Sequence, residues 1–174
     1  MIKGKKVSLG PLRDTDSHTL FGWINERELV VNSSNYRPIH RQSHDDWFSR
    51  IQRNESVRIF AIRENSENDL IGSCQLHSID LLNSGAELQI RIGRDSDRGK
   101  GYGSEAVDLL LRHAFLDLGL HRVYLEVYES NQAAIRSYEK VGFRTEGVMQ
   151  DANFVDGKYR NIVLMAILQN EWGC

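Results

Sequence analysis

A glycine-rich stretch, RGKGYGSEA at residues 98–106, constrains the fold of this chain more than any other segment. It joins the alternating segment AELQIRIG to the apolar-periodic segment SEAVDLLLRHAF. Alternation predicts a strand, and apolar residues at helical spacing predict a helix. Backbone amides at a helix start bind anions when no Cβ atoms stand in the way. The stretch therefore predicts a strand–loop–helix unit for a phosphate or pyrophosphate, with a plain glycine turn as the alternative.

The rest of the chain predicts an α/β (α+β) fold, with one domain over residues 1–174. Turn signals such as Asp156-Gly157 separate the alternating segments, which is typical of antiparallel strands. Ser43, three residues before Asp46, is expected to cap the second helix, and residues 29–42 to form a loop. The order of elements predicts a central mixed, mostly antiparallel sheet of seven strands flanked by about four helices. The expected strands are 5–13, 57–64, 70–82, 86–93, 121–130, 143–155 and 158–168, and the expected helices are 14–27, 43–51, 104–118 and 131–141.

Composition and motif spacing exclude several classes of function. A net charge of −2 offers no global attraction to nucleic acid or to an anionic membrane, and no apolar run is long enough to span a bilayer. Cys74 and Cys174 match no metal spacing, and His40 and His44 lack the glutamate of a zinc-binding HExxH motif. The N-terminus lacks the apolar stretch of a signal peptide. We therefore expect a cytoplasmic protein in a reducing setting, with no metal, nucleic acid or membrane bound.

Two motifs in the second half resemble those of the GNAT acetyltransferase superfamily. Arg98, Gly101 and Gly103 match its Arg/Gln-x-x-Gly-x-Gly/Ala motif for acetyl-coenzyme A. The segment NQAAIRSYEKVGF, from Asn131 to Phe143, matches its second signature. The resemblance covers residues 57–168 and is weaker before them. It implies the GNAT fold and the transfer of an acetyl group from acetyl-coenzyme A to a primary amine by direct attack.

The resemblance also implies where acetyl-coenzyme A would bind. The pyrophosphate would lie on the amides of residues 99–104, and the pantetheine arm along the end of strand 86–93. A splayed neighbouring strand, 121–130, would leave the gap for that arm. The implied cofactor-binding residues are Ile90, Arg91, Ile92, Arg98, Gly99, Lys100, Gly101, Tyr102, Gly103, Ser104, Asn131, Ala134, Ser137 and Lys140.

Direct attack by an amine needs a group that takes a proton and a group that helps the thiolate leave. Tyr138 stands where this family commonly has a tyrosine that protonates the thiolate, although its helical spacing also fits a packed core residue. Glu87 is the predicted base, directly or through a water, because the similar spermidine acetyltransferases carry a glutamate there. Glu126 on the next strand is the rival. Either glutamate also fits a solvated strand residue.

In this superfamily the N-terminal helices and their loop, here residues 14–54, mainly select the acceptor. Tyr36 and Arg37 in that loop are the predicted acceptor-binding residues. A basic, aromatic loop suits an amino sugar carried on a nucleoside diphosphate, and sugar-nucleotide N-acetyltransferases show a similar pattern there. Spermidine acetyltransferases carry acidic residues in this loop, whereas Arg37 and Arg41 would repel a polyamine. The predicted acceptor is therefore an amino sugar.

Two further acceptors and one other class of function stay open. Spermidine, or the N-terminal amine of a ribosomal protein, is the alternative acceptor. A protein that binds acetyl-coenzyme A without catalysis is the alternative from another class, and the retained Tyr138 and glycine motif disfavour it. We expect a small-molecule amine as the partner, and the sequence leaves assembly into a homo-oligomer open.

Overall fold

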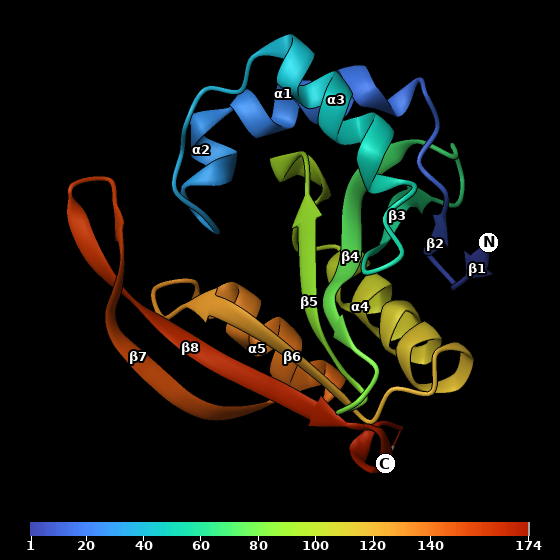
Figure 1. Cartoon of the computed structure of the whole chain (residues 1–174), viewed down its shortest axis with the longest axis vertical. Coiled ribbons are helices and arrows are strands. Elements are labelled where there is room, and N and C mark those ends of the chain that lie inside the picture. Colours follow the sequence, from blue (N-terminus) through green and yellow to red (C-terminus); the bar gives the residue numbers. More distant parts are fainter. Residues whose placement is uncertain (174) are drawn as a thin grey trace.

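One sheet of eight strands runs through the computed structural model, which describes residues 1–173; Cys174 lies outside the described residues (Figure 1). The strand order is β1-β2-β3-β4-β5-β6-β8-β7. The predicted mixed, mostly antiparallel sheet is confirmed, and the additional strand is β1, a two-residue edge strand paired with β2. The strands are β1 (Ile2–Lys3), β2 (Val7–Gly10), β3 (Arg58–Glu64), β4 (Leu70–Asp80), β5 (Gly85–Ile92), β6 (Arg122–Tyr128), β7 (Arg144–Val155) and β8 (Lys158–Leu168).

Five α-helices accompany the sheet where about four were predicted. The additional helix is the four-residue α2, which overlaps the start of the predicted loop 29–42. Within residues 1–173 no helix is both long and apolar enough to cross a bilayer. The helices are α1 (Asp16–Asn25), α2 (Arg27–Val30), α3 (Arg41–Ile51), α4 (Tyr102–Arg112), which continues as a π-helical turn over His113–Asp117, and α5 (Gln132–Val141).

The cap of α3 differs from the prediction. Ser43 lies inside the helix, and His40 is the capping residue, with its Nδ1 accepting the amide of Gln42 at 3.3 Å. His44 is buried one turn later, and its Nε2 lies 3.0 Å from the carbonyl oxygen of Ser17. Both histidines therefore have structural roles. No group of three potential metal-ligating side chains occurs in the part of the chain that the structure describes.

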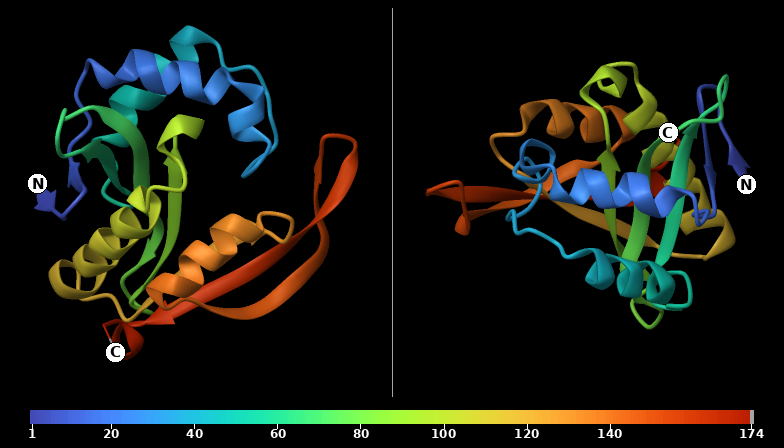
Figure 2. Two further views of the ribbon diagram at one scale, coloured as in Figure 1. Left: turned by 180° about the vertical axis from the view of Figure 1, so that it is seen from behind. Right: turned by 90° about the horizontal axis from the view of Figure 1, so that it is seen from above.

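Helices cover both faces of the sheet, because successive residues of a strand point to opposite faces. In β3, Ile62 packs into the larger apolar cluster, with α4 and α5, whereas Ala61 packs into the smaller one, with α1 and α3. Figure 2 shows the two helical layers on either side of the strands. A buried ion pair between Arg63 of β3 and Asp16 of α1, at 2.6 Å, joins the N-terminal helices to the sheet.

Strands β5 and β6 separate along most of their length. They are the one parallel pair among the described strands, and only Gly85–Glu87 and Arg122–Tyr124 pair. Beyond these residues the strands diverge (Figure 1), as predicted for residues 121–130. Just past the far end of β5, the indole of Trp23 lies against Gly93, where any side chain would collide with the ring. This contact holds α1 beside the end of β5, where β5 and β6 are separated.

Candidate active site

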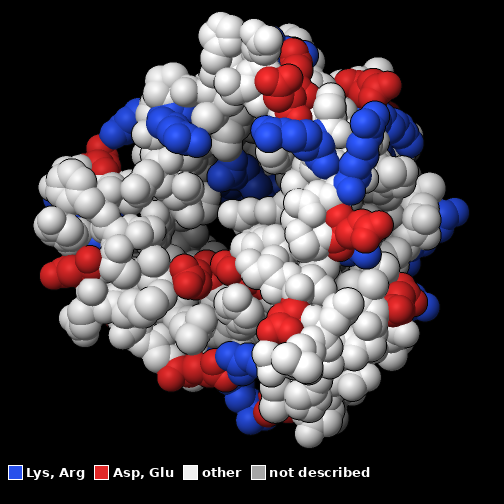
Figure 3. Space-filling view, in the orientation of Figure 1, with Lys and Arg blue, Asp and Glu red and all other residues white. Residues whose placement is uncertain are grey.

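The separation of β5 and β6 leads to a cavity of about 730 Å³. This volume is within the range of small-ligand sites. Figure 3 shows a hollow in this face of the molecule, with basic side chains above and acidic side chains below. The cavity is lined by every predicted cofactor residue except Lys100 and Tyr102, and also by Tyr138 and Glu87. Residues far apart in the sequence are thus brought together around one cavity.

The start of α4 is suited to an anion. Gly99 and Gly101 have φ angles of 75° and 83°, a left-handed conformation in which a side chain would be strained. Gly101 is the N-cap residue, and no side chain caps the helix. The first amides of α4, at residues 102–104, are therefore left for a ligand. These backbone N–H groups are suited to hydrogen bonds with the pyrophosphate of acetyl-coenzyme A.

The basic side chains beside this loop are partly occupied by protein partners. Arg98 pairs with Asp95 at 2.7 Å, and Lys100 pairs with Asp97 at 3.4 Å. Asp97 is buried, and its Oδ2 has no hydrogen-bond partner within residues 1–173. Lys6 donates its ammonium to the carbonyl of Lys100 at 2.8 Å and so anchors the loop from the N-terminal strands. The charges of Arg98 and Lys100 are therefore partly neutralised, and the backbone amides remain available to an anion, as the sequence suggested.

Helix α5 forms the opposite wall of the cavity. Asn131, a predicted cofactor residue, also caps this helix, because its Oδ1 accepts the amide of Ala134 at 3.2 Å. The hydroxyls of Ser137 and Ser104 lie 2.7 Å apart and join α5 to α4. Arg136 lines the cavity as well and was not predicted, since an isolated basic residue on a helix has no distinctive spacing.

Tyr138 packs against the larger apolar cluster and also lines the cavity. Its ring lies 5.8 Å from that of Phe143. Burial raises the pKa of its hydroxyl to about 12. The hydroxyl therefore keeps its proton at neutral pH, and full transfer to a thiolate, whose thiol has a pKa of about 8.5, is uphill. Tyr138 is suited to donating a hydrogen bond to a thiolate as it forms.

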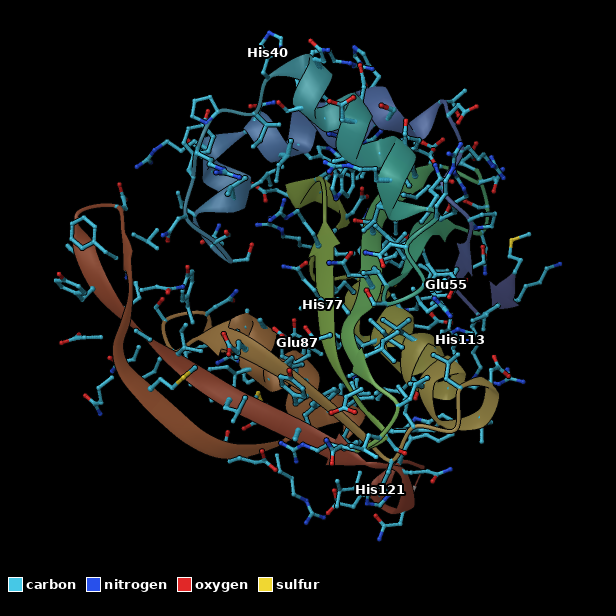
Figure 4. The ribbon with its side chains drawn as sticks, viewed as in Figure 1. His40, Glu55, His77, Glu87, His113 and His121 are labelled. Carbon is cyan, nitrogen blue, oxygen red and sulfur yellow. The ribbon has the colours of Figure 1, made fainter. Side chains whose placement is uncertain are left out.

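Two carboxylates, Glu87 of β5 and Glu126 of β6, line the same cavity. Partial burial and the charge of Glu87 raise the pKa of Glu126. Burial and the two glutamates also raise the pKa of Tyr124. His77, which was not predicted, faces Glu87 through the register of β4 with β5, and its Nε2 lies 3.8 Å from Glu87 Oε1 (Figure 4). This group of side chains suits the binding and deprotonation of a cationic amine.

The loop between α2 and α3 does not bring Tyr36 and Arg37 to the cavity. The hydroxyl of Tyr36 donates to the carbonyl of Asn25 at 3.2 Å. The side chain of Asn25 accepts the amide of Ile39 at 2.8 Å, so these contacts brace the loop against α1. Arg41 lies over the ring of Phe21, also outside the cavity. The predicted repulsion of a polyamine by Arg37 and Arg41 therefore loses its structural basis.

The family model described as an acetyltransferase (GNAT) domain matches residues 6–144 of this chain. The chain belongs to the GNAT acetyltransferase family. A spermidine N(1)-acetyltransferase of Vibrio cholerae is 34% identical over 109 residues, which are 63% of this chain and 62% of that enzyme. A probable N-acetyltransferase of Bacillus subtilis, YjcK, is 30% identical over 179 residues and 97% of each chain. The structure of this chain is also similar to the crystal structure of the Vibrio cholerae spermidine N-acetyltransferase in complex with CoA and spermine. The TM-score between the two is 0.88 at 26% sequence identity, and the match covers 95% of this chain and 97% of that one.

These similarities establish the donor and the reaction class of this GNAT protein. It is an N-acetyltransferase, and its co-substrate is acetyl-coenzyme A. The sequence alignment spans less than two thirds of the Vibrio enzyme, 62% of its length, so alignment alone does not carry over its acceptor.

Proposed function

We propose that this GNAT enzyme acetylates the primary amine of an aliphatic acceptor, with spermidine-type polyamines as the first class to test. The supporting observation is the pair Glu87 and Glu126 in the cavity. No Lys or Arg within residues 1–173 forms an ion pair with either glutamate, and their mutual repulsion contributes to the raised pKa of Glu126. A bound ammonium would relieve that repulsion.

The predicted amino-sugar acceptor is not supported. It depended on a basic loop that faces the acceptor, and Tyr36 and Arg37 lie outside the cavity. The Vibrio cholerae relative is named for spermidine, and its crystal structure is a complex with spermine. These observations favour the polyamine alternative over the amino sugar.

The residues of the cavity divide between the two substrates. Residues 102–104 hold the pyrophosphate of acetyl-coenzyme A through their amides, and the splayed edge of β5 at Ile90–Ile92 takes the pantetheine arm. Acetyl-coenzyme A supplies the activated acyl group. Asn131 and Ser137 complete the α5 side of this slot.

Glu87 and Glu126 act on the acceptor side. Glu87, with Glu126 as the rival, accepts a proton from the bound ammonium, directly or through a water, and so frees the amine to attack. Tyr138 donates a hydrogen bond where the thiolate departs, which stabilises the negative charge that develops on sulfur. As the tetrahedral adduct collapses to the amide, the second proton leaves the attacking nitrogen and is taken up by the departing thiolate through solvent. Solvent also takes up the proton held by the carboxylate.

A thiol-release assay with acetyl-coenzyme A tests this proposal against alkylamines, spermidine, amino-sugar nucleotides and N-terminal peptides. We expect turnover of the aliphatic amines, and a loss of about 100-fold in kcat/KM in Glu87→Gln with an unchanged KM for acetyl-coenzyme A. Glu55→Gln, a change at an exposed residue far from the cavity, is the matched control (Figure 4). Turnover of sugar nucleotides or peptides alone would refute the aliphatic acceptor. Binding of acetyl-coenzyme A with no turnover of any amine would favour the non-catalytic alternative.

A further inference from the structure

Arg91 carries a charge that nothing in the described chain neutralises. No carboxylate within residues 1–173 lies within 4.0 Å of its guanidinium, and the hydrogen bond that it makes is to Ser33 Oγ, at 3.3 Å. Partial burial lowers the pKa of the Arg91 side chain. A cation that is removed from water without a partner costs free energy, which a bound anion would recover.

The side chain of Arg91 points to the acceptor half of the cavity. Alternation along β5 places Glu87 and Arg91 on one face, whereas Leu88 on the other face joins the apolar cluster with α4. The contact with Ser33 agrees with this placement, because Ser33 follows α2 in the layer opposite α4. The backbone of Arg91 remains available for the predicted pantetheine contact, while its guanidinium points elsewhere.

The acceptor half of the cavity consequently has two ends of opposite charge. Glu87 and Glu126 lie near the paired ends of β5 and β6, and Arg91 lies four residues further along β5. At the rise of an extended strand, the Cα atoms of Glu87 and Arg91 are roughly 13 Å apart. Figure 3 shows the same separation of charge across the hollow. A diamine would carry its second ammonium toward Arg91 and be repelled, whereas an amine with an anionic far end would satisfy both ends.

We propose that Arg91 binds an anionic group on the acceptor, so that the preferred substrates are aliphatic primary amines that carry a carboxylate or a phosphate. This inference rests on the proposed acetylation of aliphatic amines, and within that class it predicts amines with an anionic far end in place of the polyamines named there as the first class to test. The planar guanidinium offers parallel N–H donors that match both anions. Arg91 is then a residue that determines specificity, separate from the groups that move protons.

The test uses matched acceptors, aliphatic amines of equal chain length whose far end is an ammonium, a methyl, a carboxylate or a phosphate. In the wild-type enzyme we expect kcat/KM for the anionic acceptors to exceed that for the diamine by about tenfold or more. Arg91→Gln should abolish this preference through the acceptor KM, and Arg91→Lys should keep part of it. Arg91→Glu should reverse it. Arg112→Gln, at an exposed arginine outside the cavity, is the control, and thermal unfolding verifies that each variant folds.

The readouts separate this inference from the proposed function. The carboxylate and phosphate acceptors identify which anion is bound. A wild-type preference for spermidine or the diamine that Arg91→Gln leaves unchanged would overturn the inference and leave the proposed function intact. A raised KM for acetyl-coenzyme A in Arg91→Gln, with the acceptor preference retained, would also overturn it, by assigning the guanidinium to the donor. Acetyl-coenzyme A binding with no turnover of any amine would overturn both.

Discussion

Tyr138 is a packed side chain for which we also propose a role in the chemistry. Its ring packs against the larger apolar cluster, and the residue also lines the cavity. The burial that fixes the ring also raises the pKa of the hydroxyl to about 12. Helical spacing could not separate a core tyrosine from a catalytic one, because spacing marks the buried face of a helix but not what that face contacts. Here the same face borders both the core and the substrate slot.

The hydroxyl of Tyr138 is tested by Tyr138→Phe, which keeps the ring. We expect kcat to fall by about 100-fold or more, because the leaving thiolate loses its hydrogen-bond donor. The affinity for acetyl-coenzyme A, measured by calorimetric titration, should stay close to wild type. Tyr159→Phe, at an exposed tyrosine of the β7–β8 hairpin, is the control. Wild-type turnover in Tyr138→Phe would show that the thiolate leaves without this hydroxyl.

Glu126 gives a prediction of pH dependence. Its pKa is raised in the folded protein, so the stability that comes from its protonated form is present below the ordinary value of 4.5 and is lost as the pH rises through the raised pKa. Glu126→Gln should therefore have a slightly higher Tm than wild type at neutral pH, and the difference should vanish under acidic conditions. Glu55→Gln should show no such trend. A pH-independent difference for Glu126→Gln would assign its effect to packing.

At the scale of elements, the start of α4 was predictable because its geometry is local. Gly99 and Gly101 adopt positive φ angles that only glycine adopts without strain, so the residue types report the backbone directly. The cap of α3 was not predictable in this way. Ser43 has the right residue type, but the chain enters the helix at His40, after a loop that Asn25 braces. Where a helix begins depended here on a contact distant in sequence.

Gly101→Ala tests the anion site as a backbone feature. The added Cβ would strain a residue at φ 83° by about 1 kcal/mol and would lie near the Lys6 ammonium, so the loop should shift. We expect the KM for acetyl-coenzyme A to rise about tenfold, with cooperative unfolding retained. Gly147→Ala is the control, because its φ is not positive and its Cβ would meet no atom within 4 Å. An unchanged KM in Gly101→Ala would place the pyrophosphate away from these amides.

At the scale of the whole molecule, the cavity depends on two helical layers, one on each face of the sheet, that meet where β5 and β6 separate. The α4–α5 layer carries residues that we propose for acetyl-coenzyme A, and Ser33, which follows α2 on the other side, contacts Arg91. The N-terminal helices are joined to the sheet by the buried pair Asp16 and Arg63. That ion pair therefore supports the acceptor side without contacting a substrate.

Asp16→Ala should destabilise the fold by about 3–5 kcal/mol, because it leaves the buried guanidinium of Arg63 without its partner. Chemical denaturation measures this loss, and the KM for the acceptor should rise more than that for acetyl-coenzyme A. Asp45→Ala breaks the exposed Arg41–Asp45 pair and should stay close to wild type. If both variants lost the same small amount of unfolding free energy, α1 would be held to the sheet by apolar packing alone.

The sequence by itself determined the donor side of this enzyme. Glycines at positive φ angles and the alternation of β5 are local signals, and they predicted an anion site between a strand and a helix. The resemblance of the two motifs to the GNAT superfamily then implied acetyl-coenzyme A and a role for Tyr138, and the positions of these site residues stay predictions. The hairpin at Asp156 and Gly157 was predictable for the same reason, since both residues have positive φ angles. That residues 1–174 form one domain stays a prediction.

Only the tertiary structure shows which side chains face the half of the cavity that we propose for the acceptor. Tyr36 and Arg37 are polar loop residues whose direction depends on contacts with α1, and those contacts keep them out of the cavity. His77 is brought to Glu87 by strand register. Arg91 was predicted as part of the pantetheine strand, but its side chain points toward Ser33. Which charges meet across a cavity depends on register and on the packing of distant elements, and neither is encoded in the spacing of nearby residues.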